Sequence, residues 1–132
     1  MSSNPTNPIT PYQSIGEAAG IARLVERFYL IMDSDPNAQA VRAVHGSSLK
    51  EASEKLQDFL SGWLGGPPLF MLKYGHPRMR MRHMNFAIGE VEREQWLYCM
   101  RKAMGDGSLP AELVQGLEKG FTELAFKIQN RD

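Results

Sequence analysis

Apolar residues recur at the spacing of helix faces in three long stretches of the chain. Positions three and four apart lie on one side of an α-helix. In the first stretch they are Ile21, Leu24, Val25, Phe28 and Met32. In the second they are Ala52, Leu56, Phe59, Leu60 and Trp63, and in the third Leu113, Val114, Leu117, Phe121, Leu124 and Ile128. Each stretch predicts an amphipathic helix with one buried face.

Capping and breaking residues mark where these helices begin and end. The pair Asp-Pro at 35–36 predicts a short helix with proline at its first position. The sequence Ser-Leu-Lys-Glu at 48–51 has the pattern of a capping box, which predicts a helix start at the serine. The helix that starts there is expected to end at Gly-Gly-Pro-Pro, residues 65–68. Ser108 is expected to cap the last helix.

The middle of the chain has weaker patterns. We find no clear period between residues 65–68 and Pro77, and therefore expect a long irregular loop, followed by a short helical piece over His83–Phe86. After Gly89 another helix is indicated by Val91, Trp96, Leu97, Met100 and Met104. The one alternating stretch, 78–82, is short and strongly charged, so strands are not expected. The prediction is an all-α fold.

Length and charge narrow the class of protein. A chain of 132 residues suits one domain, and we divide it into a flexible polar extension, residues 1–11, and a single globular domain, residues 12–132. Lys+Arg and Asp+Glu are both 15, which argues against general attraction to nucleic acid. The chain has neither an apolar run of the roughly 20 residues needed to span a bilayer nor the apolar core of a signal peptide. We expect a cytoplasmic protein without integral membrane contact.

Three histidines are the candidate metal ligands: His45, His76 and His83. With one cysteine and no HExxH or paired CxxC motif, a zinc site built by the protein alone is not expected. His83 ends the basic segment 76–83, and residues 59–89 contain no acidic side chain. A solvated basic loop that binds phosphate or nucleic acid is the simpler interpretation of this segment alone.

A haem site is the alternative interpretation of the same segment. Imidazole is a common ligand of haem iron, and the propionates of the cofactor need cations nearby. Arg80 and Arg82, with Lys55 on the preceding helix, can bind propionates through charge-assisted hydrogen bonds. The apolar side chains of Met79, Met81 and Met84 beside them suit a large flat ring, and we expect Met79 and Phe86 to contact it.

The order of motifs over a longer stretch favours haem. Gly-Gly-Pro-Pro-Leu-Phe at 65–70, the run from Tyr74 to His83, and Glu-Arg-Glu-Gln-Trp-Leu-Tyr-Cys-Met at 92–100 occur in sequence. This arrangement closely resembles the group II truncated haemoglobins, and the resemblance extends from about Ser14 to Ile128. It implies that family's fold, a two-over-two helical sandwich around haem b.

Carried onto this chain, the resemblance makes His83 the proximal iron ligand. It makes Tyr29, next to Phe28, a distal residue above the iron, and Trp96 a second one whose indole N–H points at the bound ligand. His45 falls where many members carry a tyrosine. Histidine can still donate a hydrogen bond at this position, but unlike tyrosine it titrates near neutral pH.

The resemblance also implies the lining of the distal pocket. Ala52 stands where longer globins place a distal histidine, and Leu56 and Phe59 follow it along the same helix.

The function implied is reversible binding of oxygen, carbon monoxide and nitric oxide at ferrous haem, by a monomer or weak dimer. Hydrogen-bond donors beside the ligand predict slow oxygen release. The alternative is an enzyme on the same cofactor, either peroxidase-like or a nitric oxide dioxygenase, which we expect to need an external reductase. The third hypothesis is a cofactor-free helical module whose basic segment binds phosphate or nucleic acid.

Overall fold

The computed structural model describes residues 9–131, apart from the side chain of Arg80. Within this range the chain forms helices and no strand. The elements are α1 (Pro11–Ile15), α2 (Glu17–Ser34), η1 (Pro36–Ala38), α3 (Gln39–Ala43), α4 (Lys50–Trp63), α5 (Leu69–Tyr74), α6 (Met79–Arg82), α7 (Glu90–Met104) and α8 (Ala111–Ile128). Most of the expected polar extension, residues 1–8, lies outside the described residues.

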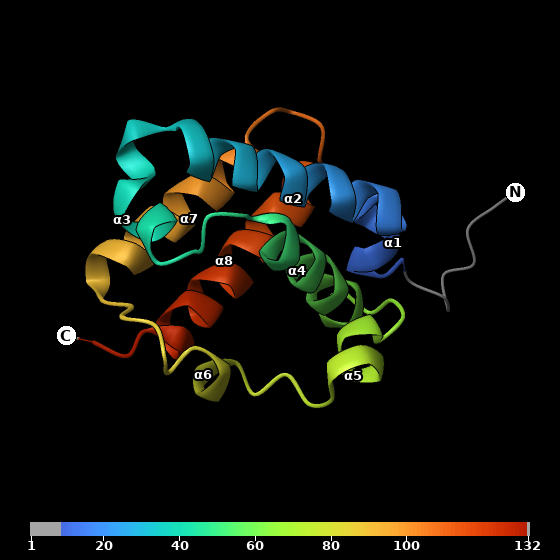
Figure 1. Cartoon of the computed structure of the whole chain (residues 1–132). Coiled ribbons are helices and arrows are strands. Elements are labelled where there is room, and N and C mark those ends of the chain that lie inside the picture. Colours follow the sequence, from blue (N-terminus) through green and yellow to red (C-terminus); the bar gives the residue numbers. More distant parts are fainter. Residues whose placement is uncertain (1–8, 132) are drawn as a thin grey trace, which may run out of the picture.

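Four long helices build the fold in two layers. Figure 1 shows α2 and α4 crossing over α7 and α8. Helix α2 packs on both α4 and α7, while α7 packs on α8. The predicted all-α class and the two-over-two arrangement are confirmed. None of the described helices is long and apolar enough to cross a membrane.

The core lies between the two layers and is built from the predicted apolar faces. The largest fully buried side chains are Phe28, Phe121, Ile21, Met32, Leu60, Leu97, Met100, Val25 and Cys99. They come from α2, α4, α7 and α8 together, so no helix pair completes the core alone. Burying a large apolar side chain contributes about 1.5–3 kcal/mol, which explains why these faces dominate the packing.

Several predicted boundaries are confirmed. Asp35 precedes Pro36 as the cap of η1, and its carboxylate accepts a hydrogen bond from the Asn37 N–H at 2.9 Å. Helix α4 ends at Trp63, just before the Gly-Gly-Pro-Pro run at 65–68. Helix α7 begins directly after Gly89.

Two predicted helix caps are wrong. Helix α4 begins at Lys50 behind Leu49; the Ser48 hydroxyl accepts from the Lys50 N–H at 3.3 Å, but Glu51 forms an ion pair with Lys55 at 2.9 Å and closes no capping box. Ser108 binds the Asp106 carboxylate through its hydroxyl at 2.6 Å, and α8 begins only at Ala111, after Pro110. Serine can bond locally within a turn as readily as it caps a helix.

The middle of the chain also differs from the prediction. The expected irregular loop contains α5, which escaped detection because its apolar residues stand in a row. Of these, Phe70 is buried while Met71 and Leu72 are largely exposed. The predicted helical piece over His83–Phe86 is wrong, since α6 ends at Arg82 and His83 lies in the turn that follows.

Candidate functional site

An aromatic cluster joins α2 to α7 inside the core. The Phe28 ring meets the ring of Tyr29 edge-on at 4.8 Å between centroids and that of Trp96 at 5.2 Å. Beyond α3, the His45 ring lies 5.9 Å from the Tyr29 ring. The structure therefore brings together Phe28, Tyr29, His45 and Trp96, four residues that the sequence places in three separate segments.

Two polar atoms of this cluster make no hydrogen bond to the described part of the chain. Among the described residues, neither the Tyr29 hydroxyl nor the Trp96 indole N–H has a hydrogen-bond partner. Burial raises the pKa of Tyr29 well above its ordinary value, so the hydroxyl keeps its proton at neutral pH. Indole nitrogen can only donate. Both side chains therefore carry a donor hydrogen, on the Tyr29 hydroxyl and on the Trp96 indole nitrogen.

His45 differs from these donors because one of its nitrogens is already used. Its Nδ1 lies 2.8 Å from the main-chain oxygen of Val41. A carbonyl oxygen can only accept, so the neutral ring carries its proton on Nδ1 and its Nε2 is an acceptor. Burial lowers the pKa of His45, and the charges of Arg42 and His83 lower it further, against the Val41 carbonyl. At neutral pH the free nitrogen of His45 therefore accepts, and it donates only after protonation in acid.

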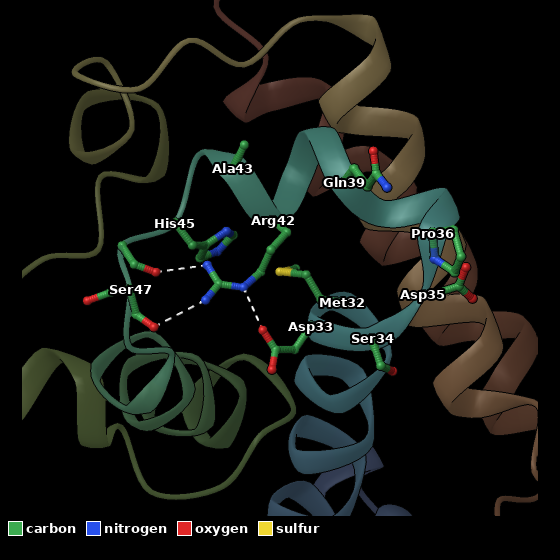
Figure 2. Close-up of a pocket in the computed structure, with 11 residues that line it drawn as sticks. Met32, Asp33, Ser34, Asp35, Pro36, Gln39, Arg42, Ala43, His45 and Ser47 are labelled. Carbon is green, nitrogen blue, oxygen red and sulfur yellow. Dashed lines mark hydrogen bonds and ion pairs between the residues drawn. The ribbon is translucent and has the colours of Figure 1, made fainter.

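Arg42 holds the loop that carries His45. Its guanidinium donates to the Asp33 carboxylate at 2.8 Å and to the main-chain oxygens of Gly46 at 2.8 Å and Ser47 at 3.2 Å. Figure 2 shows these bonds around a surface pocket bordered by the end of α2, by η1 and α3, and by the loop after α3. Sequence reasoning missed Arg42, since two of its partners are main-chain atoms without a residue signature.

His83 stands apart from this cluster, in the turn after α6. Its half-buried imidazole places Nδ1 2.6 Å from the main-chain oxygen of Met79. By the same argument the proton sits on Nδ1, which leaves the lone pair of Nε2 for a metal. No described residue hydrogen-bonds to that nitrogen. The Phe86 ring lies 6.5 Å away and is 46% exposed.

One face of helix α4 carries apolar side chains that are only partly buried. Ala52, Leu56 and Phe59 are half-buried and pack against the core. The Phe59 ring also meets the rings of Trp63, at 6.2 Å, and Phe70, at 6.4 Å. Part of this face therefore remains available to a large apolar partner.

The predicted propionate-binding cations have other partners in the structure. Lys55 pairs with Glu51, and its ammonium lies 5.5 Å from the centre of the Tyr74 ring. Arg82 donates to the main-chain oxygens of Tyr74 and His76, each at 2.9 Å, and so holds the turn between α5 and α6. The side chain of Arg80 lies outside the described residues.

These side chains fit a haem. An imidazole with an available Nε2 can ligate haem iron, the apolar side chains of α4 suit the flat ring, and the two donors are of the kind that tune ligand binding.

Comparison with known proteins identifies the family. Residues 10–130 match the family model of the bacterial-like globins. Over 107 residues the chain is 38% identical to group 2 truncated hemoglobin YjbI of Bacillus subtilis. The matched stretch covers 81% of this chain and 78% of that protein. The chain belongs to the group II truncated haemoglobins. The resemblance found in the sequence is thereby confirmed, and membership implies a haem cofactor and haem-based binding of diatomic ligands.

Solved structures agree with this assignment. The group II 2-on-2 hemoglobin of Agrobacterium tumefaciens is 41% identical to this truncated haemoglobin, with a TM-score of 0.92 over 100% of both chains. The truncated oxygen-avid haemoglobin of Bacillus subtilis is 34% identical, with a TM-score of 0.85 over 92% of this chain and 100% of that one.

Proposed function

We propose that this truncated haemoglobin holds haem b through Nε2 of His83 and reversibly binds oxygen, carbon monoxide or nitric oxide. Ferrous haem supplies an open coordination position at which such gases bind. The observation that carries the proposal is the 2.6 Å bond between His83 Nδ1 and the Met79 carbonyl, because it leaves Nε2 unprotonated. One solved relative, from Bacillus subtilis, is described as oxygen-avid.

The bond to Met79 does two things for a metal ligand. It fixes the orientation of the ring, so that little freedom is lost when Nε2 binds. It also makes Nε2 more basic, because the Nδ1–H donates to an oxygen.

Tyr29 and Trp96 are proposed to donate hydrogen bonds to the gas. The raised pKa of Tyr29 keeps its hydroxyl protonated throughout the neutral range. Each such bond contributes about 0.5–1.5 kcal/mol net, and more where the acceptor is charged. Two such donors to one bound gas would therefore favour slow release. His45 acts differently at neutral pH, since its free nitrogen accepts.

The remaining predicted residues are proposed to hold the cofactor itself. Phe28, Ala52, Leu56 and Phe59 exclude water on the distal side, while Met79 and Phe86 border the His83 side. Lys55, Arg80 and Arg82 are proposed for the propionates. Lys55 is suited to this because its present ion pair with Glu51 is a largely exposed pair between neighbouring turns of α4, and such pairs contribute little stability.

Absorption spectra of the wild type and of His83→Ala, in ferric, ferrous and carbon monoxide forms, test the proposal. We expect a haem spectrum in the wild type and altered axial ligation or loss of haem in the variant. His76→Ala is the matched control, because His76 is an exposed histidine of the same basic segment. A wild type that fails to retain haem, or a His83→Ala protein with unchanged ligation, would contradict the proposal.

A further inference from the structure

The segment that follows α8 crosses the loop that carries His83. The side-chain amide of Asn130 donates from Nδ2 to the main-chain oxygen of His83 at 2.9 Å. Its Oδ1 accepts from the main-chain N–H of Ile88 at 3.0 Å. The main-chain N–H groups of Asn130 and Arg131 both donate to the Ile88 carbonyl, at 2.8 and 3.0 Å. Four hydrogen bonds therefore connect residues 130–131 to the two ends of the loop 83–88.

Both ends of the Asn130 amide are occupied, and its Oδ1 also accepts from the Arg131 guanidinium at 3.0 Å. One end donates and the other accepts, so that neither a carboxylate nor a hydrocarbon side chain reproduces both bonds. The His83 oxygen also accepts from the N–H of Phe86 at 3.0 Å, which occupies its second lone pair. The main chain of His83 is thus held from within the loop and from the segment after α8.

The loop has few other anchors among the described residues. Residues 84–87 are exposed, and burial resumes only at Ile88. A loop with so little buried surface opens easily unless hydrogen bonds restrain it.

We propose that Asn130 is a positioning residue for the iron ligand. It restrains the main chain of His83 while the Met79 carbonyl restrains the imidazole, so that Nε2 stays at one position relative to the iron. The inference rests on the proposed function, in which His83 is the proximal ligand. Without the Asn130 bond, the imidazole of His83 can move away together with its loop. Haem would then dissociate more often before His83 rebinds the iron.

Two substitutions separate the bonds of Asn130. Asn130→Asp keeps an oxygen that accepts from Ile88 N–H but removes the donor to His83. Asn130→Ala removes both of these bonds and the bond from the Arg131 guanidinium, which Asn130→Asp keeps. Ser61→Ala is the matched control, because it deletes a side-chain bond of 2.7 Å to another loop carbonyl, that of Pro67, away from His83.

The first measurement is the rate at which the ferric haem protein transfers haem to an excess of a haem-scavenging apoprotein. We expect about five- to tenfold faster transfer in both Asn130 variants, the effect of losing one hydrogen bond, and little change in Ser61→Ala. The iron–imidazole stretching band of the ferrous protein should shift or broaden in the Asn130 variants alone.

The second measurement is amide hydrogen exchange in the haem-bound protein. Exchange at Ile88 should speed up in Asn130→Ala more than in Asn130→Asp, which keeps an acceptor for that N–H. Haem transfer and stretching bands equal to those of the wild type, or transfer accelerated equally in Ser61→Ala, would overturn the inference. Failure of the proposed function looks different, because His83→Ala would then keep its axial ligation whatever the Asn130 variants show.

Discussion

His45 and His83 both place Nδ1 against the main-chain carbonyl four residues earlier, those of Val41 and Met79. The same local bond has the same consequence in both neutral rings, since the proton sits on Nδ1 and Nε2 becomes an acceptor. In His83 this acceptor is the nitrogen proposed to bind the iron. At the residue scale, a main-chain carbonyl thus fixes the tautomer of each imidazole.

The donors Tyr29 and Trp96 predict the rate of oxygen release. In the haem-loaded protein, Tyr29→Phe and Trp96→Phe should each release oxygen about tenfold faster, the effect of removing one strong hydrogen bond. Stopped-flow displacement of oxygen by carbon monoxide measures the rate. Tyr98→Phe is the control, since the Tyr98 hydroxyl donates to Asp35 at 2.6 Å and not to the cluster. Unchanged release in both test variants would exclude them as donors.

His45 predicts a pH dependence in acid. Burial, against the Val41 carbonyl, and the charge of Arg42 lower its pKa from 6.5, with Tyr29 as its ring neighbour, so the ring is neutral at pH 7. Protonation below pH 6.5 converts Nε2 to a donor and adds a positive charge. The ferric spectrum should therefore change as the pH falls below this range, and His45→Phe should remove that change. An identical titration in the variant would show that His45 is remote from the haem.

At the scale of elements, Asp35 joins the end of α2 to η1 and α7. Its carboxylate accepts from Asn37 N–H at 2.9 Å, from the Tyr98 hydroxyl at 2.6 Å and from the Lys102 ammonium at 2.8 Å. Lys102, then Tyr98 and Asn37, hold the pKa of Asp35 far below its ordinary value. One side chain thus connects the layer of α2 to the layer of α7.

The lowered pKa of Asp35 predicts a loss of stability in acid. The unfolded chain takes up a proton near the ordinary aspartate pKa of about 3.9, while the folded protein resists protonation to lower pH. The contribution of Asp35 is therefore complete above that range and is lost as the pH falls through the folded pKa. Urea unfolding from pH 6 to pH 2 should show Asp35→Asn less stable than the wild type at pH 6, with a gap that narrows in acid. A constant gap would contradict this.

The close contact of α1 with α2 depends on Gly20. A Cβ at this position would clash with the main-chain oxygen of Ile15, an atom that cannot rotate away. Gly20→Ala should therefore lower the free energy of unfolding by about 1–3 kcal/mol. Gly116→Ala is the control, because Gly116 lies within α8 with open space beside it. That control should stabilise the protein by up to about 1 kcal/mol. Equal melting temperatures of the two variants in thermal unfolding would contradict the close contact at Gly20.

At the scale of the whole molecule, the proposed cofactor contacts elements from both layers. Its proposed neighbours come from α2, α4, α6 and α7 and from the turn that holds His83. A ligand that binds only the folded protein stabilises it by mass action, by about 4 kcal/mol at a free concentration one thousand times Kd.

Haem should therefore raise the melting temperature of the haem-free protein by many degrees. The gain should be smaller in His83→Ala, which keeps the apolar side chains of α4 but lacks the proposed ligand. Calorimetry with and without one equivalent of haem measures both effects. A melting temperature that haem leaves unchanged would exclude a structural cofactor.

The sequence by itself determined the four long helices and the types of residue available to a haem. Apolar periodicity is a local property and survives in the fold because each face must be buried. The motif order around His83, together with Tyr29 and Trp96, also sufficed for the family. The short helices α5 and α6 were not predicted, because a helix of one or two turns is too short to show a period.

Only the tertiary structure decided which atoms meet across distant segments. It placed Asn130 on the loop of His83, Arg42 on the loop of His45, and the Arg82 guanidinium on the carbonyls of Tyr74 and His76. The acceptors in these bonds are main-chain oxygens, which every residue carries, so no side-chain pattern marks them. The tautomers of both histidines follow from the same kind of bond. The protonation of Nε2 could therefore be derived only from the tertiary structure.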